Sequence, residues 1–348
     1  MAPGVLPPLA VTMGDPAGIG PEIALAAWLR RDVEHLAPFA ILGDAQMLSA
    51  RAGLLGLEIP IARIGRFEEA ATTFARSVPV LDVPLATPAA PGRPDAANGP
   101  AVIAAIERAV AATHAGEAAA VVTNPIAKSV LYAAGFRHPG HTEFLADLAL
   151  RHWPDEPAEP VMMIASDLLR VVPLTIHIAL ARVPGAISTA SIVKTARIMA
   201  AALDRDFGIA QPRIAIAGLN PHAGEDGSMG LEDRDIVAPA VAELRAEGLA
   251  ITGPHPADTL FHAARRATYD AVLCMYHDQA LIPVKTLAFD TGVNVTLGLP
   301  FVRTSPDHGT AFDIAGRGVA SPSSLIAALR LAASMAERRC GRSRVARS

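Results

Sequence analysis

Short apolar runs rich in β-branched residues alternate along this chain with longer segments whose larger apolar residues recur every three or four positions. The short runs include LAVTM (9–13), AAVVTN (119–124), RIAIAGLN (213–220) and AVLCMYH (271–277). Such alternation is typical of βαβ units, in which helices cover both faces of a mostly parallel sheet. The chain is therefore predicted to be an α/β protein.

The longer segments predict helices over 22–32, 100–116, 189–206, 235–248 and 322–338. In AVIAAIERAVAA the apolar spacing predicts one buried face. The segment 85–100 is rich in proline and predicts a loop or arm. The arginine-rich tail 336–348 is predicted to be a frayed, solvated end.

Length and composition narrow the class of protein. A chain of 348 residues exceeds one ordinary core and predicts two domains around a ligand-binding cleft. Aromatic residues make up 4% and the formal net charge is −4, which disfavours a nucleic-acid surface. Cys274 and Cys340 give no disulfide framework. Because no run approaches the about 20 apolar residues of a membrane span and the N-terminus lacks export features, we expect a cytoplasmic protein without membrane partners.

Three histidines share one kind of local setting, at or just past the end of an apolar strand-like run. They are His177 in PLTIHIAL, His222 in AGLNPHAGEDG and His277 in LCMYHDQA. The carboxyl ends of parallel strands share one edge of a sheet, so these imidazoles can meet although they are far apart in sequence. Three neutral imidazoles with an open position suit a divalent cation. The alternative is a structural, hydrogen-bonded role for each histidine.

Two further groups have the chemistry of an anion site. His141 and Thr142 lie at a predicted helix N-terminus, where unpaired N–H groups attract anions, with helix capping by Thr142 as the alternative. Lys285, Asn294 and Arg303 recur at nine-residue spacing and combine a point charge, an amide and a planar guanidinium. The alternative is three polar residues at loop ends.

Glycine-rich stretches occur near both ends of the chain. VTMGDPAGIGPE places glycines after a strand and Pro21 at the first turn of a helix, which predicts a tight turn able to bind an anion. It lacks the GxGxxG spacing of a dinucleotide fingerprint. HGTAFDIAGRG (308–318) suits close approach of a nucleotide to the backbone. Asp258, in PHPADTLFHAA, is predicted to cap a helix.

In chain order, these motifs resemble the 4-hydroxythreonine-4-phosphate dehydrogenase family, the NAD-dependent enzymes of pyridoxal phosphate biosynthesis. The resemblance extends from VTMGDPAGIGPE through TNPIAKSVLYAAGFRHPGHTEFLA, LNPHAGEDGSMGLED and ADTLF to YHDQALIPVKTL and GVNVTLGLPFVRTSPDHGTAFDIAG. It covers nearly the whole chain, with 50–100 and the arginine tail outside it.

The resemblance implies a fold like that of the isocitrate and isopropylmalate dehydrogenases, with two α/β/α domains flanking a cleft and mostly parallel sheets. The expected domains are 1–137 with 315–348, built from both chain ends, and 138–314, which would carry metal, substrate and dimer contacts. It also implies a homodimer whose metal ligands come from both subunits.

Site residues follow from the same resemblance. The metal ligands would be His177, His222 and His277, and the cation zinc, magnesium, manganese or cobalt. The substrate contacts would be His141, Thr142, Lys285, Asn294 and Arg303. NAD, or alternatively NADP, would contact His308, Gly309, Asp313 and Gly316. Proton transfer, or orientation of a ligand histidine, would fall to Asp258, Asp278 and Lys128.

The implied reaction is oxidation of 4-phosphooxy-L-threonine at C3, followed by decarboxylation to 3-amino-2-oxopropyl phosphate. Hydride would pass from C3 to NAD while the metal polarises the C3 oxygen, and the resulting β-keto acid would lose carbon dioxide. One alternative is oxidation of a related phosphorylated four-carbon hydroxy acid. Others are a metal-dependent phosphatase, which would not need the HGTAFDIAG loop, and a binding protein without catalysis.

Overall fold

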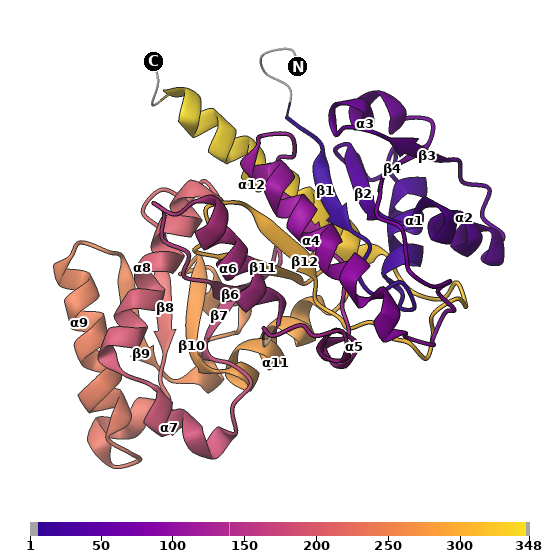
Figure 1. The fold of residues 1–348 in the computed structure, drawn as a ribbon. Helices are drawn as coiled ribbons and strands as arrows, with labels where there is room; N and C mark the ends of the chain where they lie inside the picture. Colours follow the sequence, from indigo (N-terminus) through magenta and orange to yellow (C-terminus); the bar gives the residue numbers. More distant parts are fainter. Residues whose placement is uncertain (1–5, 139, 346–348) are drawn as a thin grey trace. The chain divides into compact units, whose positions relative to one another are not determined.

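The computed structural model describes residues 6–138 and 140–345. It divides into two compact units, Met1–Pro160 with Leu299–Ser348 and Val161–Gly298, each built of helices and a sheet (Figure 1). Both sheets are mostly parallel, so the predicted α/β class is confirmed. Among the described residues no single helix is long and apolar enough to cross a membrane, and one bent pair, Leu180–Ala186 with Thr189–Arg205, meets that test only when joined.

The sheet of the first unit is entirely parallel where its strands pair. Its order is β3 (Ile61–Ile64), β4 (Val78–Asp82), β2 (Phe39–Gly43), β1 (Leu9–Thr12), β5 (Val121–Thr123) and β12 (Arg303–Pro306). Strands β1, β2 and β5 are buried along their whole length, as expected for parallel strands covered on both faces. The strands predicted near 9–13 and 119–124 are confirmed.

Helices of the first unit follow the apolar periodicity. They are α1 (Gly20–Leu29), α2 (Ala45–Leu54), α3 (Glu68–Thr73), α4 (Gly99–His114), α5 (Lys128–Ala133), α6 (His141–His152) and α12 (Ser323–Val345), with the 3₁₀ turn η1 at Ala96–Asn98. On α4, Val102, Ile106 and Val110 recur at helical spacing and are buried, which confirms the predicted apolar face. The segment before η1 is irregular, as predicted for 85–100.

The sheet of the second unit is mixed. Its order is β11 (Val293–Leu297), β6 (Val161–Ala165), β7 (Arg170–Thr175), β10 (Ala271–Tyr276), β8 (Ile214–Ala217) and β9 (Ile251–His255). Strand β6 is antiparallel to both β11 and β7, and the other pairs are parallel. A tight turn between Ser166 and Leu169, closed by mutual hydrogen bonds, reverses the chain between β6 and β7.

The helices of the second unit are α7 (Val183–Ala186), α8 (Thr189–Arg205), α9 (Ala238–Ala246), α10 (Ala263–Arg266) and α11 (His277–Ala288). Shorter turns are η2 (Leu180–Arg182), η3 (Pro221–Gly227), η4 (Asp233–Val237) and η5 (Ala257–Thr259). The predicted helix 189–206 is confirmed, and its start is fixed by a capping box between Ser188 and Ser191. The helix predicted from 235 is entered through the π turn η4.

Two expectations differ from the structure. The divisions between units fall after Pro160 and before Leu299, whereas we expected 137/138 and 314/315. Helix α6 packs against α4, and β12 pairs with β5, which keeps both flanking segments in the first unit. The prediction of a frayed tail from 336 is wrong as far as Val345, because α12 continues to that residue and Arg339 donates to the carbonyl oxygen of Pro300 at 2.8 Å.

Candidate active-site residues

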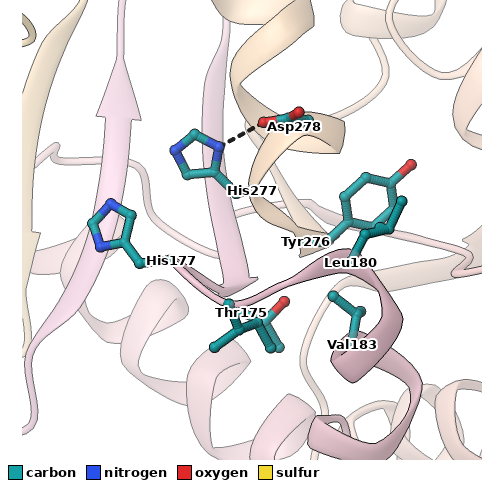
Figure 2. Close-up of a pocket in the computed structure, with 8 residues that line it drawn as sticks. Thr175, His177, Leu180, Val183, Tyr276, His277 and Asp278 are labelled. Carbon is teal, nitrogen blue, oxygen red and sulfur yellow. Dashed lines mark hydrogen bonds and ion pairs between the residues drawn. The ribbon is translucent and has the colours of Figure 1, made fainter.

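The carboxyl ends of three neighbouring strands carry the three predicted metal ligands. Strands β7, β10 and β8 are adjacent and parallel, so their carboxyl ends share one edge of the sheet. His177 follows β7, His277 directly follows β10 as the first residue of α11, and His222 lies in η3 after β8. The rings of His177 and His277, both drawn in Figure 2, have centroids 5.7 Å apart. These two imidazoles meet as the strand-end argument requires.

His222 does not complete this pair within one chain. Among the described residues, no group of three or more His, Cys, Asp or Glu side chains is arranged to hold a metal ion. His222 is exposed on η3, which begins beyond the end of β8. A site made of all three histidines therefore stays a prediction.

His277 has the hydrogen bonding of a metal-ligating histidine. Its Nδ1 lies 2.7 Å from Oδ1 of Asp278, drawn as the dashed line in Figure 2. Because a carboxylate only accepts, this bond places the ring proton on Nδ1 and leaves the Nε2 lone pair available to a cation. A hollow of about 230 Å³ adjoins both rings and is lined by Thr175, His177, Ile178, Leu180, Val183, Tyr276, His277 and Asp278. The two imidazoles are thus suited to serve as part of the ligand set of a borderline divalent ion.

The turn that carries His222 has a rare backbone conformation. Residues 222–226 all have positive φ, between 39° and 80°, although only Gly224 among them is a glycine. Asp233 anchors the chain just before it: Oδ1 accepts from the Leu219 N–H at 2.7 Å and Oδ2 from the Asn220 N–H at 2.9 Å. Asp233 is 1% exposed. Asp233 was not predicted from the sequence. LNPHAGEDGSMGLED contains several acidic residues, and their spacing does not indicate which one is buried.

The first unit gathers three cationic or basic residues of the predicted set. Arg303 begins β12 and is buried, and burial lowers the pKa of its guanidinium to about 10. His141 is the first residue of α6, and Lys128 is the first residue of α5. Burial, and then the positive charges of Arg303 and Lys128, hold the pKa of His141 well below its usual value. The three side chains are therefore close enough to interact.

His141 is neutral in this setting and has an unused ring nitrogen. Its residue is half-buried as a whole, but Nε2 is sealed from solvent and has no hydrogen-bond partner among the described residues. A buried polar atom without a partner is costly, and such atoms cluster where a ligand completes the bond. An imidazole beside two cations is suited to an anionic ligand.

Two predicted helix caps are wrong. Helix α6 begins at His141, so Gly140 holds the N-cap position and Thr142 lies within the first turn. Asp258 lies inside the 3₁₀ turn Ala257–Thr259, whose N-cap is Pro256. In both cases the turn begins earlier than the capping pattern indicated, so the side chains are left for other roles. Asp258 is exposed and Thr142 half-buried.

The remaining predicted substrate contacts belong to the second unit. Lys285 lies in the last turn of α11, and Asn294 lies on β11. Both are half-buried. His141, Thr142 and Arg303 belong to the first unit, so the convergence of all five residues on one ligand stays a prediction.

The loop 308–318 is fastened to the turn between β1 and α1. The carbonyl oxygen of Thr310 accepts from the Ile19 N–H at 3.0 Å, and the Gly316 N–H donates to Oε1 of Glu22 at 3.0 Å. Gly316 has φ +78°, which glycine adopts without strain. A Cβ on Gly18 would lie 2.9 Å from the Thr310 oxygen, so glycine is required for this close approach.

The four predicted nucleotide contacts all lie in this loop. Asp313 and Gly309 are exposed, and Gly309 has no described atom within 4 Å of the position a Cβ would occupy. His308 directs Nδ1 to the Gly309 carbonyl oxygen at 3.0 Å, while its Nε2 is buried without a described partner. The loop thus presents backbone and ring nitrogens beside a helix start, but which of them contact a nucleotide stays a prediction.

Fold and site together define a class of α/β protein with paired imidazoles on one unit and a buried guanidinium beside a histidine on the other. Residues 34–332 match the family model described as pyridoxal phosphate biosynthetic protein PdxA. The chain therefore belongs to the PdxA family, and the resemblance found in the sequence is confirmed.

Similar proteins cover the chain almost completely. A 4-hydroxythreonine-4-phosphate dehydrogenase from Methylorubrum populi is 60% identical over 333 residues, which is 95% of each chain. One from Bradyrhizobium diazoefficiens is 56% identical over 344 residues, covering 97% of this chain and 99% of the other. A crystal structure of 4-hydroxythreonine-4-phosphate dehydrogenase from Klebsiella pneumoniae superposes with a TM-score of 0.86 at 39% identity, covering 97% of this chain and all of that one.

Proposed function

We propose that this chain is a 4-hydroxythreonine-4-phosphate dehydrogenase that depends on NAD and a divalent cation. The observation that carries this proposal is the 60% identity to a dehydrogenase of that name over 95% of both chains. The reaction is oxidation of the phosphorylated hydroxythreonine at C3, followed by loss of the carboxyl group as carbon dioxide.

The divalent cation would be held by His177, His222 and His277, drawn from two chains of a homodimer. The approach of the His177 and His277 rings supports this, as does the carboxylate of Asp278 on Nδ1 of His277. When bound, the cation supplies Lewis-acid polarisation of a substrate oxygen. Imidazole ligands favour zinc or cobalt, and magnesium or manganese are the alternatives.

Exposed apolar side chains support the homodimer. In the second unit Leu180, Ile282 and Phe289 are 67%, 63% and 76% exposed. Leu180 also lines the hollow beside His177 and His277. Large exposed apolar side chains on a unit whose site has too few ligands favour a second copy of the chain as the partner.

The anionic groups of the substrate would be bound by the predicted contact residues. Arg303 carries a fixed, buried charge, and His141 offers a neutral ring nitrogen whose partner is the ligand. Thr142, Lys285 and Asn294 would add a hydroxyl, a point charge and an amide. This binding holds C3 in register for hydride transfer to NAD, which would lie on the loop that includes His308, Gly309, Asp313 and Gly316.

Proton transfer requires a group that can change its charge near the reacting carbon. Lys128 is exposed at the start of α5, and its charge already influences His141. Asp278 is exposed and bonded to His277. Lys128 would move a proton at Nζ, while Asp278 would orient the His277 ring, and Asp258 is the remaining candidate for proton transfer.

The test is turnover by the purified protein with 4-phosphooxy-L-threonine, NAD and one divalent cation, followed by NADH absorbance. We expect NADH and carbon dioxide in equal amounts, and loss of both after chelation of the metal. Parallel reactions use NADP and a phosphorylated four-carbon hydroxy acid. Stronger turnover of the four-carbon acid, or release of inorganic phosphate without NADH, would overturn the proposal.

A further inference from the structure

We propose that Thr123 is a positioning residue for substrate binding, because its hydroxyl aims the Arg303 guanidinium at the anionic group of the substrate. The inference rests on the proposed role of Arg303 as a substrate contact. It adds a residue that touches neither substrate nor cofactor and acts through its neighbour.

The register of the sheet brings Thr123 and Arg303 together. Strand β12 pairs in parallel with β5 so that Arg303 lies opposite Val121. Side chains two residues apart on a strand point to the same face, so Thr123 lies on that face one step further along β5. Nη2 of Arg303 donates to Oγ1 of Thr123 at 2.7 Å. Thr123 is 0% and Arg303 3% exposed, so water does not compete for this bond.

The chemistry of the acceptor matters as much as its position. A buried guanidinium needs oxygen partners, and a carboxylate in this position would cancel the charge that an anionic ligand requires. A hydroxyl is a neutral acceptor, so this bond orients the guanidinium plane without cancelling its charge. Elsewhere in the chain Arg213 meets Asp270, and Arg205 meets Asp206, in bonds that do neutralise the guanidinium.

The Arg303 guanidinium lies within electrostatic reach of an anion-binding side chain already described. The charge of Arg303 is felt at His141, whose sealed Nε2 has no described partner, and Lys128 acts on the same ring. A guanidinium is a rigid fork, so holding one terminal nitrogen fixes the direction of its other N–H groups. Loss of the Thr123 hydroxyl would leave the positive charge in place but remove the hydrogen bond that holds Nη2 of the guanidinium.

The experiment compares four variants by steady-state kinetics and by competitive inhibition with inorganic phosphate. Thr123→Val keeps the shape and removes the acceptor, and Thr123→Ser keeps the acceptor. Thr304→Val is the matched control, because Thr304 is equally buried on β12 but bonds to the carbonyl oxygen of Ala328 on α12. Arg303→Ala tests the underlying role of the guanidinium.

A lost hydrogen bond to a charged group predicts that Thr123→Val raises the KM for the phosphorylated substrate and the inhibition constant of phosphate by about tenfold or more. We expect kcat to change far less, Thr123→Ser to restore both constants, and Thr304→Val to leave both near wild type. Should Thr123→Val fail to fold, Thr123→Ala gives the same comparison at a smaller volume.

The outcomes separate the inference from the proposed function. Unchanged constants in Thr123→Val, together with a large rise in KM for Arg303→Ala, would overturn the positioning role and leave the substrate role of Arg303 intact. Unchanged constants in Arg303→Ala would overturn both. Equal effects of Thr123→Val and Thr304→Val, or failure of serine to rescue, would reduce Thr123 to a structural residue and refute the inference.

Discussion

Replacing Asp233 with alanine should destabilise the second unit by about 3 to 6 kcal/mol, because two charge-assisted bonds to buried backbone N–H groups are worth about 1.5 to 3 kcal/mol each. The carboxylate accepts from Leu219 and Asn220 at 2.7 and 2.9 Å, at the point where the chain enters the left-handed turn. Each left-handed residue other than glycine costs about 1 to 2 kcal/mol, so the turn has a strong tendency to relax once the anchor is lost. His222, which the turn carries, would then lose its fixed position.

The assay is urea unfolding followed by circular dichroism, with cobalt binding measured on the same samples. Asp235→Ala is the control, since Asp235 lies two residues away, is exposed and bonds to Arg234. We expect a clear shift to lower urea for Asp233→Ala, weaker cobalt binding, and behaviour close to wild type for Asp235→Ala. Equal unfolding midpoints for the two variants would refute the anchoring role of Asp233.

Three other predictions follow from the buried and paired groups. Because the pKa of His141 in the folded protein lies well below the ordinary value of 6.5, the unfolded chain binds the proton more readily, and stability should fall as pH decreases below about 6.5. His141→Gln should reduce this slope in urea midpoints measured across that range, and an unchanged slope would contradict the assignment. Cys274 is buried with a raised pKa and Cys340 is exposed, so a thiol reagent should modify native wild-type protein but leave Cys340→Ser unmodified until it unfolds. Asp278→Asn should weaken cobalt binding by about 10- to 100-fold, because the carboxylate orients the His277 ring. The control is Asp290→Asn, beyond the other end of α11, which should bind cobalt like the wild type. Equal cobalt affinities for the two variants would refute the role of Asp278.

Much of the fold could be predicted because buried parallel strands leave a strong signal. Runs such as LAVTM and AVLCMYH are apolar along their whole length, and β1 and β10 occupy them. The antiparallel strand β6 was not predicted, since the turn after it, Ser166–Leu169, contains neither glycine nor proline. The unit boundaries differed from expectation because they depend on helix packing and strand pairing. Neither of these contacts can be read from amino-acid composition.

The candidate site divides in the same way. His177 and His277 could be found because each follows a strand. The pairing of these two strands in the sheet then brings the two rings together. Thr123 could not be found, because its partner Arg303 lies on another strand. Asp233 could not be found either, because its partner is the backbone just before a preceding turn. The capping roles of Thr142 and Asp258 were wrong because turn starts are accurate only to a residue or two from sequence.

The pairing of β12 with β5 also has a consequence for biosynthesis. Thr123 and Arg303 are 180 residues apart, so at about 5 to 20 residues per second the ribosome needs about 10 to 40 s to deliver β12 after β5. Throughout that interval β5 is an open edge on the nascent chain, with unpaired backbone groups that invite wrong partners. The inserted segment Val161–Gly298 is continuous and emerges complete before then. Newly made chains should therefore be most prone to aggregation, and most dependent on chaperones, late in translation.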